Sequence, residues 1–85
     1  MNKKKLLRKA LSGSKNIRFR ELVALAEAFG FSLDRIKGSH HIFRHPQLHE
    51  LINLQNCEGD AKPYQVRQFL ELIEQYHLRL EGEET

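Results

Sequence analysis

The chain has 85 residues, a formal net charge of +3, and 40% hydrophobic and 29% charged residues. At this length we expect one domain with a small core, because so short a chain buries only about 60% of its unfolded surface. The single cysteine, Cys57, excludes an internal disulfide and a cysteine-rich zinc site, and it fits a reducing compartment.

Charge is distributed unevenly along the chain. Residues 1–20 hold eight Lys or Arg and no acid, whereas residues 71–85 hold five Glu and one Arg. A basic head of this kind attracts polyanions or forms a solvated helix face, and both readings stay open. The N-terminal segment has no apolar stretch long enough for a signal peptide or a membrane span, so we expect a cytoplasmic protein that makes no use of a membrane.

Hydrophobic periodicity predicts six elements. A basic helix is expected over residues 3–11 and is ended by Ser12-Gly13-Ser14. A second helix is expected over 18–29 and ends at Gly30. Strands follow over 31–37, 40–45 and 50–55, the first with alternation that its last two residues break, and a final helix starts at Pro63 and runs to 77.

This order of elements predicts an α+β fold, a two-layer sandwich in which a three-stranded antiparallel sheet carries helices on one face. We divide the chain into a basic helical extension (1–15), a folded domain (16–79) and a disordered acidic tail (80–85). Alternation along the second strand places His40, Ile42 and Arg44 on one face of the sheet. It places the other three residues, His41, Phe43 and His45, on the opposite face. With Ile42 taken as the core residue, we expect those three on the face away from the helices: His41, Phe43 and His45.

The run Gly38-Ser39-His40-His41-Ile42 places two histidines just after a glycine turn. Histidine has the side-chain pKa nearest neutrality, so it can exchange a proton at cellular pH. A zinc site is not expected, because His41 and His45 would stand about 13 Å apart along a strand and no cysteine pair assists. Ser39 and Cys57 lack the surroundings of a hydrolytic nucleophile, and no cofactor is expected.

Cleavage of RNA fits these residues, because RNA carries its own nucleophile in the 2′-hydroxyl and needs only a base, an acid and cations for the phosphorane. His41 is the candidate base or acid, and Phe43 is either a platform for base stacking or an aromatic that is exposed or covered by a partner. The candidates for RNA binding and charge stabilisation are Arg35, Lys37, Ser39, His40, Arg44 and Lys62. Two alternatives stay open: a noncatalytic RNA-binding module of the same fold, and a protein whose basic first helix docks an acidic partner.

Several stretches resemble the HicA toxins of bacterial type II toxin-antitoxin pairs. They are Glu21-Leu22 through Gly30-Phe31, the run Lys37-Gly38-Ser39-His40-His41-Ile42-Phe43-Arg44-His45-Pro46, and Lys62-Pro63 with Val66-Arg67-Gln68-Phe69-Leu70. The resemblance implies a fold similar to the double-stranded-RNA-binding domain, α-β-β-β-α, to which this chain adds its N-terminal helix. It also implies a ribosome-independent endoribonuclease that cleaves mRNA and arrests growth until a HicB-like antitoxin covers the active histidine.

In the family motif the functional histidine follows Gly-Ser-x, a position that His41 occupies here, while His40 stands at the variable position. The chain departs from the family pattern in two places. Residues 1–15 are extra, and Gln55-Asn56 stands where many members have a proline and a histidine.

Overall fold

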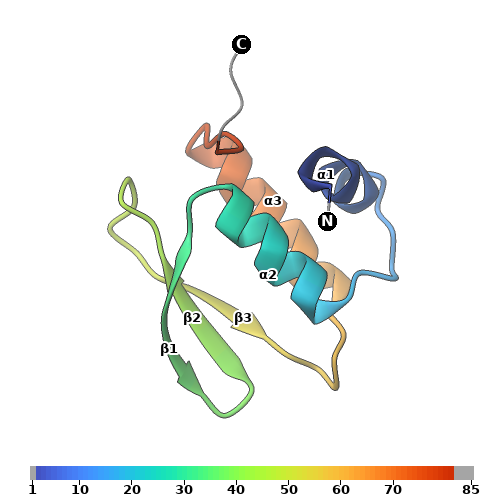
Figure 1. Cartoon of the computed structure of the whole chain (residues 1–85), viewed down its shortest axis with the longest axis horizontal. Coiled ribbons are helices and arrows are strands. Elements are labelled where there is room, and N and C mark those ends of the chain that lie inside the picture. Colours follow the sequence, from blue (N-terminus) through green and yellow to red (C-terminus); the bar gives the residue numbers. More distant parts are fainter. Residues whose placement is uncertain (1, 82–85) are drawn as a thin grey trace.

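The computed structural model describes residues 2–81, and Figure 1 shows the helices and the sheet that they form. Each element predicted from the sequence is present, with ends displaced by at most two residues. The elements are α1 (Lys3–Leu11), α2 (Phe19–Ala28), β1 (Ser32–Lys37), β2 (His40–Arg44), β3 (Ile52–Gln55) and α3 (Pro63–Gln75).

Local signals set the ends of the helices. The side chain of Asn2 accepts a hydrogen bond from the Lys5 N–H (3.1 Å) and so caps the first turn of α1. After α2 the chain reverses at Gly30, whose φ of +97° is costly for any residue with a Cβ atom. Pro63 opens α3 at a position where a helix needs no N–H donor.

The sheet is antiparallel with the order β1-β2-β3, so β2 is the central strand. In β1 the register shifts between Leu33 and Arg35, which leaves Asp34 as a bulge. Leu33 pairs with Phe43 and Ile36 pairs with His41, so the bulge places Leu33 and Ile36 on the same face. This shift is the physical reason why the polarity of β1 falls out of phase at its end.

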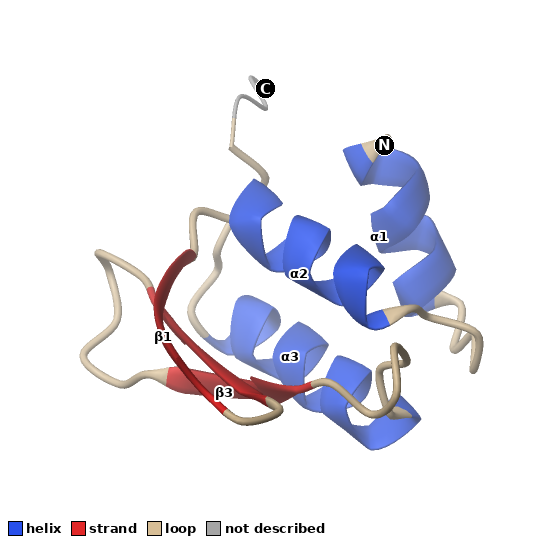
Figure 2. Ribbon diagram, turned by 60° about the horizontal axis from the view of Figure 1, so that its bottom comes forward, coloured by secondary structure: helices blue, strands red, loops and turns tan. Residues whose placement is uncertain are grey.

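The helices lie on one side of the sheet, with α2 and α3 next to it and α1 outside them (Figure 2). The core lies between these layers and contains Phe43 (1% exposed) and Leu54 (3%) from the sheet, with Leu22 (0%) from α2. The predicted orientation of β2 is therefore wrong. The alternation itself is correct, but the larger Phe43 takes the core position and Ile42 lies partly buried on the open face.

Gln65 joins α3 to the outer edge of β3. Its side-chain Nε2 donates to the Asn53 carbonyl (2.6 Å), and its Oε1 accepts from the Gln55 N–H (2.9 Å). Gln65 is 8% exposed, and both of its polar atoms have partners, as the burial of an amide requires. This contact fixes where α3 begins relative to the sheet.

The segment after α3 folds back onto the helices. Leu78 (8% exposed) and Leu80 (7%) are buried, and the Glu81 N–H donates to the Ala28 carbonyl (2.6 Å). The prediction of a disordered tail over 80–85 is therefore wrong for residues 80 and 81. The remaining four residues of that tail lie outside the described residues.

The helix of the N-terminal extension, α1, packs on the other two helices. Leu6 and Ala10 of α1 are buried in the core, and Lys9 Nζ forms an ion pair with Glu21 Oε1 of α2 (3.2 Å). The helix predicted from the basic segment is thus attached by apolar and ionic contacts together.

Candidate functional site

His41 is partly buried on the helix side of β2. Its ring meets the ring of Phe19, the first residue of α2, edge to face with centroids 4.8 Å apart. Among residues 2–81, its Nδ1 is the buried side-chain nitrogen or oxygen atom that has no hydrogen-bond partner. Leaving such an atom unpaired costs about 1–3 kcal/mol, so its presence calls for an explanation beyond packing.

Two backbone contacts tie the loop over 56–62 to residues that neighbour His41. The Asn56 N–H donates to the carbonyl of Ser39 (2.9 Å), in the turn before β2, and the Phe19 N–H donates to the carbonyl of Gly59 (2.9 Å). The loop is therefore hydrogen-bonded both to the turn that precedes His41 and to Phe19, whose ring contacts the ring of His41.

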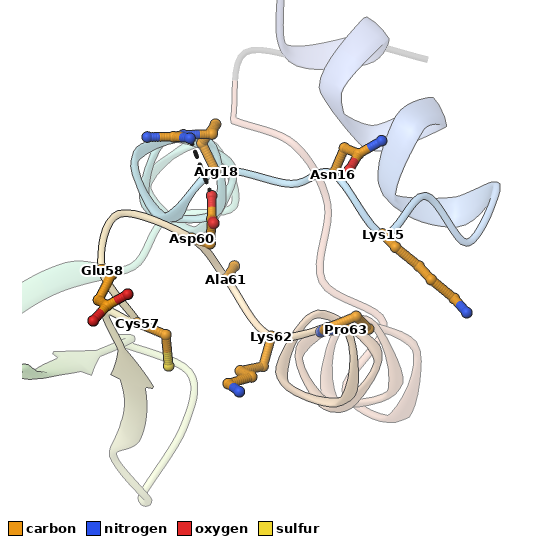
Figure 3. A pocket seen from close by; sticks show the side chains of 9 residues that line it. All are labelled: Lys15, Asn16, Arg18, Cys57, Glu58, Asp60, Ala61, Lys62 and Pro63. Atoms are coloured by element: carbon orange, nitrogen blue, oxygen red, sulfur yellow. Dashed lines mark ion pairs between the residues drawn. The ribbon is translucent and has the colours of Figure 1, made fainter.

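An open pocket of about 710 Å³ lies at this loop, between the segment that precedes α2 and the start of α3. Figure 3 shows Lys15 and Lys62 on either side of Pro63, and Arg18 turned toward Asp60. Arg18 Nη1 lies 3.2 Å from Asp60 Oδ1. The lining residues are Lys15, Asn16, Arg18, Cys57, Glu58, Asp60, Ala61, Lys62 and Pro63.

Of the cations that the sequence suggested, Lys62 is exposed and lines this pocket. Lys37 is paired in register with His40, and Arg35 with Ile42, which puts these residues on the face of the sheet opposite His41. The sequence interpretation grouped these side chains into one site, whereas the sheet separates them.

Two arginines of the open face share one carboxylate. Arg44 Nη1 lies 3.2 Å from Asp34 Oδ1, and Arg35 Nη1 contacts Asp34 Oδ2. His40, on the same face, is hydrogen-bonded through Nδ1 to Asn53 Oδ1 (3.1 Å). Ser39 is exposed in the turn. These groups form a polar surface of their own, apart from the ring of His41.

Phe43 is 1% exposed and lies in the core, so it is not a platform on which a nucleobase can stack. The apolar side chain exposed beside His41 is instead Ile36, its partner in the register (53% exposed). Ile36 escaped the sequence interpretation, because its exposure depends on the bulge in β1 and on β1 being the outer strand.

His45, the residue after β2, is buried and fully hydrogen-bonded. Its Nε2 donates to the carbonyl of Phe29 (2.9 Å), and its Nδ1 accepts from the Gln47 N–H (3.0 Å). These two partners assign the neutral tautomer with the proton on Nε2. His45 therefore has a structural role that its position in the sequence did not reveal.

Glu21 fixes the N-terminus of α2, where Phe19 supports His41. The backbone N–H of Arg18 donates to Glu21 Oε1 (2.8 Å) and is the main cause that lowers the pKa of this carboxyl below its ordinary value. Partial burial opposes that shift, and Lys9 adds to it. A carboxylate in the first turn also complements the helix dipole.

Within residues 2–81, no three His, Cys, Asp or Glu side chains gather as a set that fits a metal ion. None of the helices described there has the length and apolar character needed to span a membrane.

Two cations of the pocket, Lys15 and Arg18, were not singled out from the sequence. Lys15 belongs to a segment read as an extension, and Arg18 is one of many arginines in a basic stretch. Only the folding of 15–18 against the loop over 56–62 brings them beside Lys62.

Comparison with known protein families gives a match over most of the folded domain. The family described as HicA toxin of bacterial toxin-antitoxin matches residues 19–75, from the start of α2 to the end of α3. No curated protein and no solved structure matches the chain, so the likeness to the double-stranded-RNA-binding domain stays a prediction.

Proposed function

The chain belongs to the HicA toxin family of bacterial toxin-antitoxin systems, and from this premise we propose that it is an endoribonuclease that cleaves mRNA in the cytoplasm without a metal ion. The observation that supports the proposal best is the state of His41. Its ring is held by Phe19, remains partly accessible, and has a buried Nδ1 without a partner. A ring positioned in this way suits proton transfer to or from a bound ligand.

The proposed step is transesterification within the RNA backbone. His41 removes the proton of a 2′-hydroxyl, and the 2′-oxygen forms a bond to the adjacent phosphorus. The bond from phosphorus to the 5′-oxygen breaks, and that oxygen takes a proton from solvent. The products are a 2′,3′-cyclic phosphate and a 5′-hydroxyl, and no oxidant or metal ion takes part.

Cations stabilise the negative charge that develops on the phosphorane. We assign this role to Lys62, because it is exposed in the loop that the backbone contacts tie to Ser39 and Phe19. Residues of the turn and of the open face are assigned to RNA on either side of the cleaved bond: Lys37, Ser39 and His40 by contact, and Arg35 and Arg44 by long-range attraction.

Cleavage of a labelled RNA oligonucleotide in the presence of EDTA tests the proposal. His41→Ala should lower the rate about 10²- to 10⁴-fold, the usual effect of losing a proton-transfer group. His49→Ala is the matched control, because it removes an exposed histidine that lies in the loop after β2 and has no part in the proposed step, and its rate should stay within a few fold of the parent.

Two outcomes would contradict the assignment. If His41→Ala cuts as fast as the parent, His41 is not the catalytic group. If the parent binds the RNA and leaves it intact, the protein is a noncatalytic RNA-binding module of this fold.

We further propose that a HicB-like antitoxin neutralises the toxin by covering His41. One equivalent of purified antitoxin should then stop cleavage and keep RNA away from the histidine. A toxin-antitoxin complex that still cuts RNA at the full rate would show that the antitoxin acts elsewhere.

A further inference from the structure

The helices cover one face of the sheet and leave the other face open (Figure 2). The register sets the side chains of this open face in two rows across the strands, Lys37, His40 and Gln55 next to the turn and then Arg35, Ile42 and Asn53. The turn that precedes His41 borders the first row. An RNA strand that reaches His41 on the helix side can therefore continue over this turn onto the open face.

His40 and Asn53 form a hydrogen-bonded pair on the open face. The Nδ1 of His40 lies 3.1 Å from Asn53 Oδ1, and because an amide oxygen only accepts, the Nδ1–H donates. This bond holds the amide in one orientation. Asn53 is exposed, and one lone pair of its Oδ1 and both hydrogens of its Nδ2 have no partner among the described residues. The amide thus offers an acceptor and a donor in a fixed order.

An amide of fixed orientation discriminates between nucleobases, whereas one that turns over freely does not. On their pairing edges, adenine and cytosine place an amino donor beside a ring acceptor, and guanine and uracil place a carbonyl acceptor beside a ring N–H donor. The two classes present opposite orders, so a held amide fits one class better. Ile42, the register partner of Asn53, is half-buried and adds apolar surface against which a base can lie.

Cations outnumber carboxylates on the open face. Asp34 is the one acidic residue in the three strands, and both Arg35 and Arg44 contact its carboxylate, so this group of three keeps a net positive charge. Lys37 is exposed and forms no ion pair with another residue of the described range, 2–81. The open face therefore attracts phosphate groups.

The open face lacks the apolar centre that is typical of protein interfaces. The large apolar side chains exposed on β1, Leu33 and Ile36, lie on the helix side, because they pair with Phe43 and His41. The apolar side chain that the strands place on the open face is Ile42, which is half-buried. A polar and positively charged surface is typical of nucleic-acid interfaces, so these features favour RNA over a protein as the occupant.

We propose that Asn53, held in position by His40, hydrogen-bonds the edge of one unpaired nucleobase and so determines which RNA sequences the protein prefers. Asn53 is the specificity-determining residue, and His40 is a positioning residue for its amide. The inference rests on RNA being the substrate in the proposed function. It goes beyond that function by placing selection of the sequence on the opposite face of the sheet from His41.

Fluorescence anisotropy of the full chain with labelled 2′-O-methyl oligonucleotides of A, C, G or U tests the inference. The methylated 2′-oxygen cannot attack phosphorus, so the probes stay intact. The parent should bind one class, A and C or G and U, about tenfold more tightly than the other, as two hydrogen bonds to a base predict. Asn53→Ala should bring this ratio below about twofold. Gln75→Ala is the matched control, because it removes an exposed amide at the last residue of α3, and its ratio should equal that of the parent.

Two further variants separate recognition of the base from a structural effect. Asn53→Asp keeps the size of the side chain and the bond to His40 but has no donor hydrogens, so the ratio between the classes should fall. His40→Phe keeps a ring and frees the amide to turn over, so the ratio should fall while the less favoured probes bind as they do to the parent. A structural role of His40 alone would weaken all four probes equally and leave the ratio unchanged.

Three results would overturn the inference. The first is equal affinity of the parent for the four probes. The second is a ratio in Asn53→Ala equal to that of the parent. The third is a loss of affinity of Asn53→Ala for the purified antitoxin with unchanged binding of the probes, which would assign the open face to a protein. Cleavage of unmodified RNA is measured separately, because its absence in the parent would refute the proposed ribonuclease activity and leave the base preference standing.

Discussion

His41, near the start of β2, and His45, the residue after its end, have nearly the same aromatic setting. His41 meets Phe19 with ring centroids 4.8 Å apart at 63°, and His45 meets Phe31 with centroids 4.8 Å apart at 64°. The hydrogen bonds differ: both nitrogens of His45 have partners, whereas Nδ1 of His41 has none. Packing alone therefore does not tell a structural histidine from a candidate functional one, but the accounting of hydrogen bonds does.

The largest expected effect separates the two histidines by activity. His41→Phe keeps a ring against Phe19 but leaves no nitrogen that can take up a proton, so the RNA cleavage rate should fall about 10²- to 10⁴-fold. The free energy of unfolding should stay equal to that of the parent or rise, because no hydrogen bond is lost. Cleavage assays and urea denaturation measure the two quantities. A His41→Phe variant with full RNA cleavage activity would contradict the functional role of His41. A fall of several kcal/mol in its free energy of unfolding would instead give His41 a structural role like that of His45.

The reciprocal substitution should act on stability. His45→Phe leaves the buried carbonyl of Phe29 and the N–H of Gln47 without their partner, so the free energy of unfolding should fall by about 2 kcal/mol. Urea denaturation measures the loss, and a stable His45→Phe protein would refute the structural role given to His45.

The comparison extends to two glycines: Gly30, which lies against the ring of His45, and Gly38, in the turn that precedes His41. At Gly30 a Cβ atom would lie 3.0 Å from His45 Nε2 at a φ of +97°, whereas at Gly38 it would meet nothing within 4 Å at a φ of +58°. Gly30→Ala should therefore cost about 2 kcal/mol and Gly38→Ala about 1 kcal/mol. Thermal unfolding of both variants shows which substitution costs more stability. Equal losses would mean that the close approach to His45 does not add to the cost of Gly30→Ala.

The smallest expected effect concerns Glu21, at the end of α2 that supports His41. Its pKa in the folded protein lies below the ordinary value of 4.5, so its contribution to stability is present above about pH 4.5 and is lost as the pH falls through the folded pKa. Glu21→Gln should be less stable than the parent by about 0.5–1 kcal/mol at pH 7. The difference should shrink below pH 4. Melts from pH 3 to 7 measure it, and a constant difference would contradict the assignment.

Much of the fold was predictable because apolar residues recur with clear periods. The spacing in α2 and α3, the stop at Gly30 and the start at Pro63 determine helices that the sequence predicts to within two residues. The turn at Gly38-Ser39 likewise fixes the β1-β2 hairpin, with a positive φ at its first residue.

The phase of β2 was the main error in the predicted fold, and it has a physical cause. Alternation divides a strand into two faces but does not say which face is buried. Ile42 and Phe43 are both good core residues, and only the volume between the sheet and the helices selects Phe43. This choice moved His41 to the helix side, next to Phe19, and separated it from Arg35 and Lys37.

The candidate site was predictable only where one segment carries it. His41 follows a local motif, and its identification from the sequence remains a prediction that the proposed assays test. Lys15 and Arg18 join Lys62 through tertiary contacts alone, and nothing local in the sequence marks them. Asp34 likewise engages Arg35 and Arg44 because of a bulge that polarity patterns do not specify.

The link from Gln65 to β3 has a consequence for aggregation. The Asn53 carbonyl and the Gln55 N–H are the groups to which an added strand would pair, and one amide side chain occupies both. Growth of cross-β structure from this side would first have to displace Gln65. The opposite border, β1, is protected differently, by the bulge at Asp34 and by charged side chains, two devices that hinder strand-by-strand polymerisation.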